Sequence, residues 1–233
     1  MEKSTIKKWW IASIGILLLI VGSACEAVET NTEVSVEEDD LRVATVGDSI
    51  TYYSFSGNNY PEQLDEMLGE DYAVQNFGES NYAAQSSSDF PYGTTESYKE
   101  SLEYEPELVI FMLGTNDTKA NNWDGAEQFK AEYTELLESY LDLESVSRVI
   151  LATPPTVFLE NPPKGSIDPA NIEPIHDVIE EVATEYDLEF VDMTAKTAGH
   201  PDWFFDGIHP TETGAEQLAT IFYDQIKNKV VSQ

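Results

Sequence analysis

Apolar and polar positions follow two alternating patterns between residues 41 and 233. Short runs that are β-branched or continuously apolar predict strands, and apolar residues at helical spacing, such as Leu64, Met67 and Leu68, predict helices. The predicted strands cover 41–47, 72–78, 107–114, 147–155 and 188–193. The predicted helices cover 60–68, 126–143, 174–187 and 214–230. Repeated alternation of strand and helix is typical of a parallel sheet with helices on both faces.

The ends of these predicted strands are the places to look for chemistry. In open α/β sheets, ligands bind beyond the carboxyl ends of the strands, and long loops in such domains often carry function. The long connections here are 79–95 and 156–172. Three strands are followed by a glycine and polar side chains, in "GDSI" (47–50), "FGES" (77–80) and "GTND" (114–117). We therefore expect a functional site at this edge of the sheet.

Residue types that suit nucleophilic catalysis occur at this edge. Ser49 follows the first strand directly, but a free hydroxyl needs a base to take its proton and an orienting partner for that base. Asp206 and His209, in "DGIHP" before the last helix, can supply both. A developing oxyanion needs donors, which the Gly78 N–H and the Asn116 amide can provide. The simpler alternative is that the serine and the Asp–His turn only cap helices.

Taken in order, these blocks resemble those of the SGNH, or GDSL-type, hydrolase family. The resemblance rests on "GDS" (47–49), "NFGES" (76–80), "GTND" (114–117) and "DGIHP" (206–210), and it covers about residues 41–228. It implies a flavodoxin-like, three-layer α/β/α sandwich with a five-stranded parallel sheet.

The resemblance also implies a role for each residue. Ser49 is then the nucleophile, His209 the general base and Asp206 the group that orients the imidazole. The implied oxyanion hole consists of the Ser49 and Gly78 N–H groups and the Asn116 side chain.

The sequence departs from the family pattern in the second block. Many relatives have a second glycine where Asn81 stands, and asparagine tolerates left-handed backbone angles better than most residues. In the first block, we expect Asp48 to brace the turn of the nucleophile through backbone hydrogen bonds.

The implied activity is serine ester hydrolysis. The stretches "YPEQLDEMLG" (60–69), "MLGTNDTKANNW" (112–123) and "TPPTVF" (153–158) resemble the carbohydrate-side members, those similar to sialate O-acetylesterases and polysaccharide deacetylases. We therefore expect a small acylated carbohydrate or glycan substrate that loses a short acyl group, acetyl foremost. Aromatic residues near the edge are candidates for sugar contacts, with ordinary packing as the alternative: Tyr52, Tyr53, Tyr82, Tyr92, Trp123, Trp203 and Phe204.

Two other functions stay open. One is a lipolytic member of the family, of the lysophospholipase or thioesterase type, although the polar, Pro/Gly-containing loops 79–95 and 156–172 argue against a groove for a long acyl chain. The other is a non-catalytic, glycan-binding lipoprotein of the cell surface. Against it, competent residue types fill all five chemical positions.

The first 25 residues predict export. Lys3, Lys7 and Lys8 precede an uncharged, largely apolar run, and small residues lead to Cys25, the only cysteine. This resembles a bacterial lipoprotein signal, in which the cysteine is lipidated, and implies a cell-surface protein anchored to the membrane. An uncleaved anchor or plain secretion is the alternative. Residues 26–40 predict an acidic, solvated linker, and 41–233 the hydrolase domain.

Charge and composition exclude several classes of partner. The chain has 44 acidic and 12 basic residues, a formal net charge of −32, which repels nucleic acid and anionic lipid headgroups. Such acidity is typical of adaptation to salty or alkaline surroundings, and composition does not distinguish the two. No two histidines have metal-ligand spacing and no phosphate-binding loop is present, so we expect no metal and no cofactor. Nothing in the pattern predicts an oligomeric state.

Overall fold

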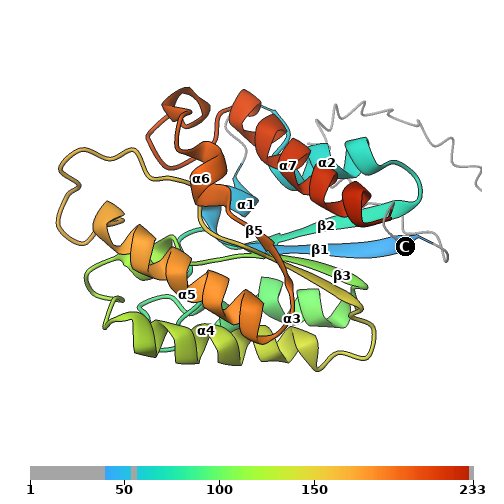
Figure 1. Cartoon of the computed structure of the whole chain (residues 1–233), viewed down its shortest axis with the longest axis horizontal. Coiled ribbons are helices and arrows are strands. Elements are labelled where there is room, and N and C mark those ends of the chain that lie inside the picture. The colour runs from blue at the N-terminus through green and yellow to red at the C-terminus, as the bar shows by residue number, and fades with distance from the viewer. Residues whose placement is uncertain (1–39, 54–56, 231–233) are drawn as a thin grey trace, which may run out of the picture. The chain divides into compact units, whose positions relative to one another are not determined.

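The computed structural model describes residues 40–53 and 57–230, and it contains one parallel sheet between two layers of helices (Figure 1). The strand order is β2-β1-β3-β4-β5. The strands are β1 (Leu41–Gly47), β2 (Tyr72–Gly78), β3 (Leu108–Met112), β4 (Arg148–Ala152) and β5 (Glu189–Val191). The predicted five-stranded parallel sheet is therefore confirmed, with strands slightly shorter than the apolar runs suggested.

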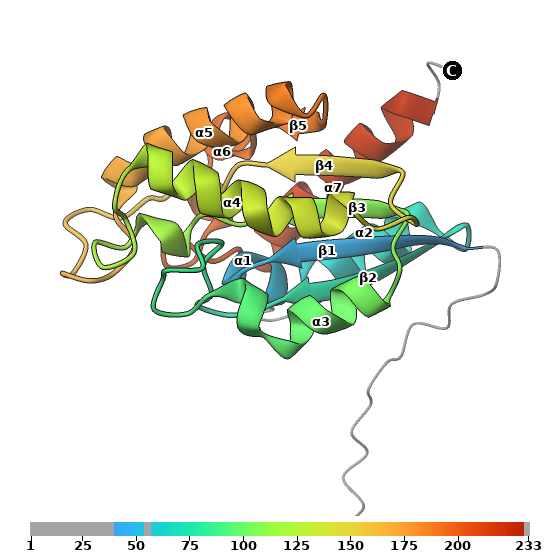
Figure 2. The same cartoon turned by 90° about the horizontal axis from the view of Figure 1, so that it is seen from below.

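The helices cover the two faces of the sheet separately (Figure 1; Figure 2). One face carries α3 (Glu96–Glu103), α4 (Ala126–Leu141) and α5 (Ile172–Glu185). The other carries α1 (Ser49–Tyr52), α2 (Tyr60–Leu68), α6 (Met193–Thr197) and α7 (Glu212–Val230). Four 3₁₀ turns lie in the connections: η1 (Tyr92–Thr94), η2 (Asn116–Thr118), η3 (Pro169–Asn171) and η4 (Pro201–Trp203).

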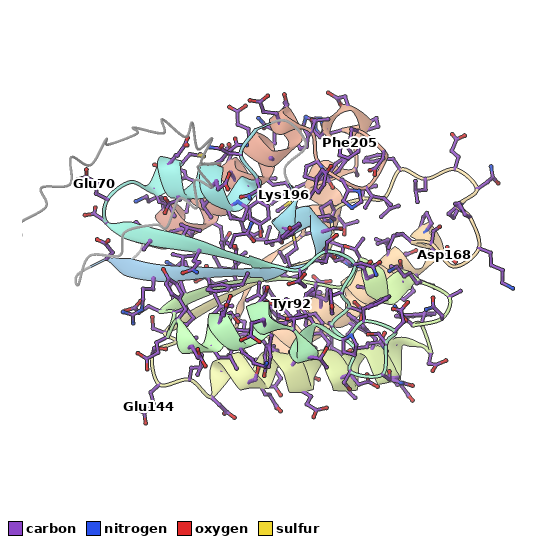
Figure 3. All side chains as sticks on the ribbon, turned by 180° about the vertical axis from the view of Figure 1, so that it is seen from behind. Glu70, Tyr92, Glu144, Asp168, Lys196 and Phe205 are labelled. Carbon is purple, nitrogen blue, oxygen red and sulfur yellow. The ribbon has the colours of Figure 1, made fainter. Side chains whose placement is uncertain are left out.

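Side chains of successive residues in the central strands point alternately into two separate hydrophobic cores. In β3 all five residues are buried: Val109 and Phe111 face α4 and α5, whereas Leu108, Ile110 and Met112 face α2 and α7. This double burial explains the continuous apolar run in the sequence. On the first face, Phe111 meets the rings of Tyr133 and Tyr140 edge-on. Figure 3 shows Tyr92 in the interior on this side and Glu70 and Glu144 at the surface.

Helix α3 had not been predicted. Its sequence, "ESYKESLE", is mostly polar, and only Ser101 in it is fully buried. Tyr98 and Leu102 pack against the core with part of their surface, which gives a weak apolar face. The helix is instead defined by its start, where the Thr95 side chain accepts a hydrogen bond from the Tyr98 N–H (3.0 Å).

Helix α1 lies very close to the ends of two strands. Gly47 and Gly78 are paired in the register of β1 and β2. A Cβ atom at Gly47 would collide with the Thr51 side chain, and one at Gly78 would collide with the backbone nitrogen of Tyr52. Both strands therefore end in glycine because no side chain fits between the sheet and this helix.

The predicted export segment 1–25, Cys25 and most of the linker 26–40 lie outside the described residues, so the lipid anchor and the location of the protein stay predictions. Across residues 40–53 and 57–230, no helix has an apolar stretch long enough to span a membrane.

Replacing Gly78 with alanine should lower the free energy of unfolding by about 2 kcal/mol, because the new methyl group meets backbone atoms of α1 that cannot turn away. The matched control is Gly199→Ala, where the space around the added Cβ is open; we expect a change within about 0.5 kcal/mol. Urea unfolding followed by circular dichroism measures both. Equal stability of the two variants would contradict the close packing of α1.

Candidate active site

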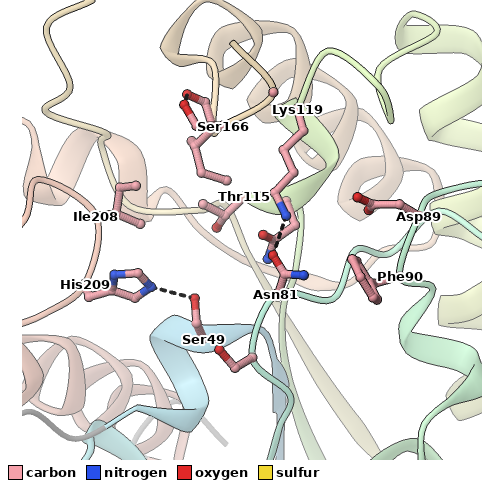
Figure 4. A pocket seen from close by; sticks show the side chains of 13 residues that line it. Ser49, Asn81, Asp89, Phe90, Thr115, Lys119, Ser166, Ile208 and His209 are labelled. Atoms are coloured by element: carbon pink, nitrogen blue, oxygen red, sulfur yellow. Dashed lines mark hydrogen bonds between the residues drawn. The ribbon is translucent and has the colours of Figure 1, made fainter. Parts of the chain in front are cut away.

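Three predicted residues from distant parts of the chain meet at the carboxyl edge of the sheet. Ser49 begins α1, directly after β1, and is 8% exposed. Its Oγ lies 2.8 Å from His209 Nε2 (Figure 4), and His209 Nδ1 lies 2.7 Å from Asp206 Oδ2. The two contacts form a continuous hydrogen-bonded series of hydroxyl, imidazole and carboxylate, in the order that nucleophilic catalysis requires.

The first block folds as its sequence predicted. Asp48 caps α1, since its Oδ1 accepts a hydrogen bond from the Ile50 N–H (2.9 Å). The expectation that Asp48 braces the turn of Ser49 is therefore confirmed. Asp48 is almost completely buried, and this burial raises the pKa of its carboxyl despite the hydrogen bond from Ile50.

The turn that carries His209 is built around the carboxylate of Asp206. One oxygen, Oδ1, accepts the N–H groups of Ile208 (3.0 Å) and His209 (2.7 Å), while the other binds the imidazole. Gly207 has a φ of +86° and its carbonyl accepts the Phe158 N–H, which ties the turn to the loop after β4. The same side chain thus shapes the turn and orients the ring.

The hydrogen bonds also set the charge of Asp206. Partial burial acts to raise its pKa, but the bonds from the His209 N–H, the His209 ring and the Ile208 N–H outweigh burial and lower it. The carboxylate is therefore ionised at neutral pH, as the partner of a base that gains a positive charge must be.

Asn116, the expected side-chain oxyanion donor, lines the same cleft as Ser49 and His209. It begins η2, the first turn after β3. One hydrogen of its amide is donated to the Tyr82 carbonyl (2.9 Å), which fixes the orientation of the group. A primary amide has two N–H bonds, so the second remains for a ligand.

The expectation that Gly78 supplies an oxyanion donor is wrong. Its N–H is already donated to Asn76 Oδ1 at 2.8 Å, and Gly78 is not among the residues that line the cleft. Asn76 is itself held by donating to the Thr51 carbonyl (3.0 Å). Gly78 allows α1 to pack closely on β2. The spacing of the motif does not distinguish this packing role from a role in binding the oxyanion.

Asn81, three residues further on, is the better candidate for this donor. It lines the cleft with Ser49 and has a φ of +79°, in the left-handed region. Within residues 40–53 and 57–230, no acceptor is recorded for its N–H. The sequence signal for Asn81 was its departure from the family pattern. Many relatives have glycine at this position, and glycine is favoured where the backbone has a positive φ.

The cleft has a volume of about 440 Å³ and is lined by both polar and apolar side chains. Ser49 and His209 lie at one end, and Asp89, Lys119 and Ser166 line it further out (Figure 4); Asn116 also lines the cleft. Phe90, Ile167 and Ile208 contribute apolar surface. Loops 79–95 and 156–172, the two long connections of the sequence, thus both contribute to the cleft wall.

Comparison with known proteins identifies the family. The GDSL-like Lipase/Acylhydrolase family matches residues 45–217, which is most of the chain. The chain belongs to this family. The expectation of an SGNH/GDSL-type hydrolase family is thereby confirmed, and the match to a family of lipases and acylhydrolases agrees with the expected carboxylic ester hydrolase class.

Two curated relatives are similar to this GDSL-family chain. An acetylxylan esterase from Xylanibacter ruminicola is 32% identical over 213 residues, which cover 82% of this chain and 44% of the relative. A multidomain esterase from Ruminococcus flavefaciens is 23% identical and covers 96% of this chain and 33% of the relative. The chain therefore spans less than half the length of these two proteins.

Solved structures share the fold. A lipase/acylhydrolase from Enterococcus faecalis has a TM-score of 0.68 at 21% identity, over 81% of this chain and 96% of the other. Est24, a carbohydrate acetylesterase from Sinorhizobium meliloti, has a TM-score of 0.62 at 18% identity, over 80% and 98%. At these identities the likeness shows the architecture alone, and it confirms the α/β sandwich.

The aromatic candidates divide into two groups in this GDSL-family domain. Tyr92 and Phe204 are buried, so the expectation that they contact a sugar is wrong; the Tyr92 hydroxyl donates to the Phe77 carbonyl (2.6 Å) and completes the core.

Tyr53 is exposed, and its ring centre lies 5.9 Å from that of His209. Tyr52 is exposed as well, and Trp203 stacks on His200. Phe90, in loop 79–95, is 44% exposed, lines the cleft and was not singled out from the sequence.

Asp117, the last residue of the third block, holds loop 79–95 in place. Its carboxylate is fully buried and accepts the N–H groups of Ala84 (3.0 Å) and Gln85 (2.9 Å). Burial raises its pKa to about 7, and nearby Asp48 adds to this effect, while the two N–H bonds oppose it. The folded chain therefore binds a proton at Asp117 more tightly than the unfolded chain does.

The raised pKa of Asp117 predicts a loss of stability with rising pH. Its contribution is fully present below the ordinary pKa of 3.8 and is lost as the pH rises to about 7. Relative to Asp117→Asn, the wild type should lose about 2 to 3 kcal/mol of unfolding free energy between pH 5 and pH 8. Urea unfolding at both pH values measures this, with the exposed Asp71→Asn as control. Parallel pH profiles for wild type and Asp117→Asn would contradict the assignment.

Proposed function

We propose that this chain is a serine ester hydrolase that removes short acyl groups, acetyl foremost, from a carbohydrate. The observation that carries the proposal is the pair of hydrogen bonds from Ser49 through His209 to Asp206. Each of the three groups has the partner that its role needs, and the series opens into a cleft.

The mechanism follows from these contacts. Ser49 Oγ attacks the ester carbonyl while its proton moves to His209 Nε2, and Asp206 stabilises the imidazolium that forms. The negative carbonyl oxygen of the tetrahedral intermediate takes hydrogen bonds from the Asn116 amide and from the N–H groups of Ser49 and Asn81. Nε2 then gives its proton to the leaving alcohol, and the acyl group stays on Ser49.

The second half of the reaction releases the acid. Water attacks the acyl-serine carbonyl and loses a proton to His209, the same oxyanion donors act again, and the Ser49–acyl bond breaks. Ser49 takes back a proton from His209, so free serine and a carboxylic acid are restored. Every proton in both halves passes through Nε2, which is why its 2.8 Å contact with Ser49 is decisive.

The carbohydrate part of the proposal is supported by the cleft and by one relative. Asp89 and Ser166 offer a carboxylate and a hydroxyl, which suit a hydroxylated group more than a long acyl chain. The relative at 32% identity is an acetylxylan esterase. The apolar surface of Phe90, Ile167 and Ile208 in the same cleft favours the second candidate, a lipolytic hydrolase.

Replacing Ser49 with alanine should reduce ester hydrolysis by about 10³-fold or more, because no other group can form the acyl-enzyme. The control is Ser147→Ala, at the opposite end of the sheet, which should keep full activity. Acid release is measured from acetyl and octanoyl chromogenic esters and from an acetylated xylooligosaccharide. Preference for the octanoyl ester would favour the lipolytic candidate. A folded protein that releases no acid from any substrate would favour the non-catalytic, glycan-binding alternative.

A further inference from the structure

Lys119 occupies an unusual position beside the cleft. It follows η2 and is only 8% exposed, although lysine is almost never buried without a charged partner. Its Nζ donates to the side-chain oxygen of Asn81 at 2.6 Å (Figure 4). Within residues 40–53 and 57–230, no ion pair of Lys119 within 4.0 Å is found. The close contact of this ammonium is therefore with a neutral amide.

Three acidic residues act on Lys119 at longer range. Asp89, which lines the same cleft, and the buried Asp48 and Asp117 interact electrostatically with its ammonium. Burial lowers the pKa of the Lys119 ammonium, and these three acids oppose the change. Asp89 is itself fixed by the side-chain amides of Asn121 (2.9 Å) and Asn122 (3.0 Å), so it does not move to pair with Lys119.

The left-handed conformation of Asn81 depends on what its side chain binds. For most residues with a Cβ this conformation costs about 1 kcal/mol or more relative to glycine, and asparagine tolerates it better because its short polar side chain can accept a hydrogen bond. The nearby backbone offers little: the Tyr82 N–H reaches the Glu79 carbonyl only at 3.4 Å. The side-chain oxygen of Asn81 is the group through which the rest of the protein can hold this residue, and Lys119 binds it.

We propose that Lys119 is a positioning residue, which holds Asn81 by its side chain so that the Asn81 N–H points at the carbonyl oxygen of the ester. The inference rests on the proposed function, because it concerns the stabilisation of the same oxyanion. It adds a residue that touches neither the serine nor the ester: its effect passes through Asn81.

The proposal predicts a change in kcat more than in KM. A donor aimed at the oxyanion acts in the transition state, so its misplacement slows the chemical step and leaves substrate binding nearly unchanged. Lys119→Met, which keeps the length of the side chain without its charge, should lower kcat on a chromogenic acetyl ester about 10-fold to 100-fold, since loss of one oxyanion donor costs about 10²-fold to 10³-fold. KM should stay within about twofold.

A double-mutant cycle with Asn81→Gly separates positioning from direct action. Glycine adopts a positive φ without support and keeps the backbone N–H, so Asn81→Gly removes the contact with Lys119 without removing the proposed donor. In that background Lys119→Met should have almost no further effect, because the contact it would break is already gone. Lys119→Arg, which keeps a charged donor, should recover part of the activity lost in Lys119→Met.

A second readout makes the test independent of the natural substrate. The rate at which an aryl fluorophosphonate labels Ser49 depends on serine, base and oxyanion donors, and on no sugar or acetyl group. The same pattern should appear: Lys119→Met should slow labelling relative to wild type, whereas Asn81→Gly and the double variant should be labelled at equal rates. If this pattern holds while no acetylated sugar is hydrolysed, the substrate proposal fails and the role of Lys119 stands.

Three results would overturn the proposal. Equal losses from Lys119→Met in the wild-type and Asn81→Gly backgrounds would mean that the ammonium acts directly on substrate or oxyanion. An unchanged kcat and labelling rate in Lys119→Met would mean that Asn81 needs no support. A wild type that fluorophosphonate does not label would remove the oxyanion chemistry altogether. If Lys119→Met fails to fold, Lys119→Gln carries the same comparison.

Discussion

The close approach of α1 to the carboxyl ends of β1 and β2 is the constraint on which the site depends. Gly47 and Gly78 leave no side chain between sheet and helix, so the backbone that carries Ser49 lies directly on the strand ends. The other proposed functional groups are positioned relative to the Ser49 hydroxyl. Asn116 lines the same cleft after the neighbouring β3, and His209 contacts Ser49 from the turn before α7, because parallel strands bring their ends to one edge.

Carboxylates, more than regular secondary structure, hold the loops around that edge. Asp48, Asp117 and Asp206 each accept one or two backbone N–H groups in three different segments. In a chain with 44 acidic residues these three are distinguished by what they bind. Two are fully buried with raised pKa values, and Asp206 has a lowered one, because its oxygens also accept from an imidazole near solvent.

The sequence predicted the sheet and the Ser–His–Asp series because both leave local marks. Continuous apolar runs reveal strands buried on both faces, and the motifs lie where those runs stop. Gly78 was misjudged because a glycine needed for close packing and one needed for ligand contact look the same in a motif; the decisive fact, its bond to Asn76, is tertiary. Helix α3 was missed because its apolar face is weak. Tyr92 was misjudged as a candidate for sugar contact because its burial depends on a tertiary hydrogen bond, from its hydroxyl to the Phe77 carbonyl. The contact of Lys119 with Asn81 joins residues 38 positions apart, beyond the reach of any local pattern.

The distance along the chain between Ser49 and His209 has a consequence for how this protein matures. The two residues are 160 positions apart, and the turn of His209 leads into α7, which packs on α2 through Tyr60 and Phe222. Contacts of such large separation form late, since much of the chain must be ordered before they repay the entropy of closing the loop. A nascent chain that has completed its sheet but not docked α7 would therefore hold an inert serine. Under the proposed mechanism, catalytic competence would arrive in one step with the docking of α7, so ester hydrolysis would report that docking as directly as any spectroscopic signal.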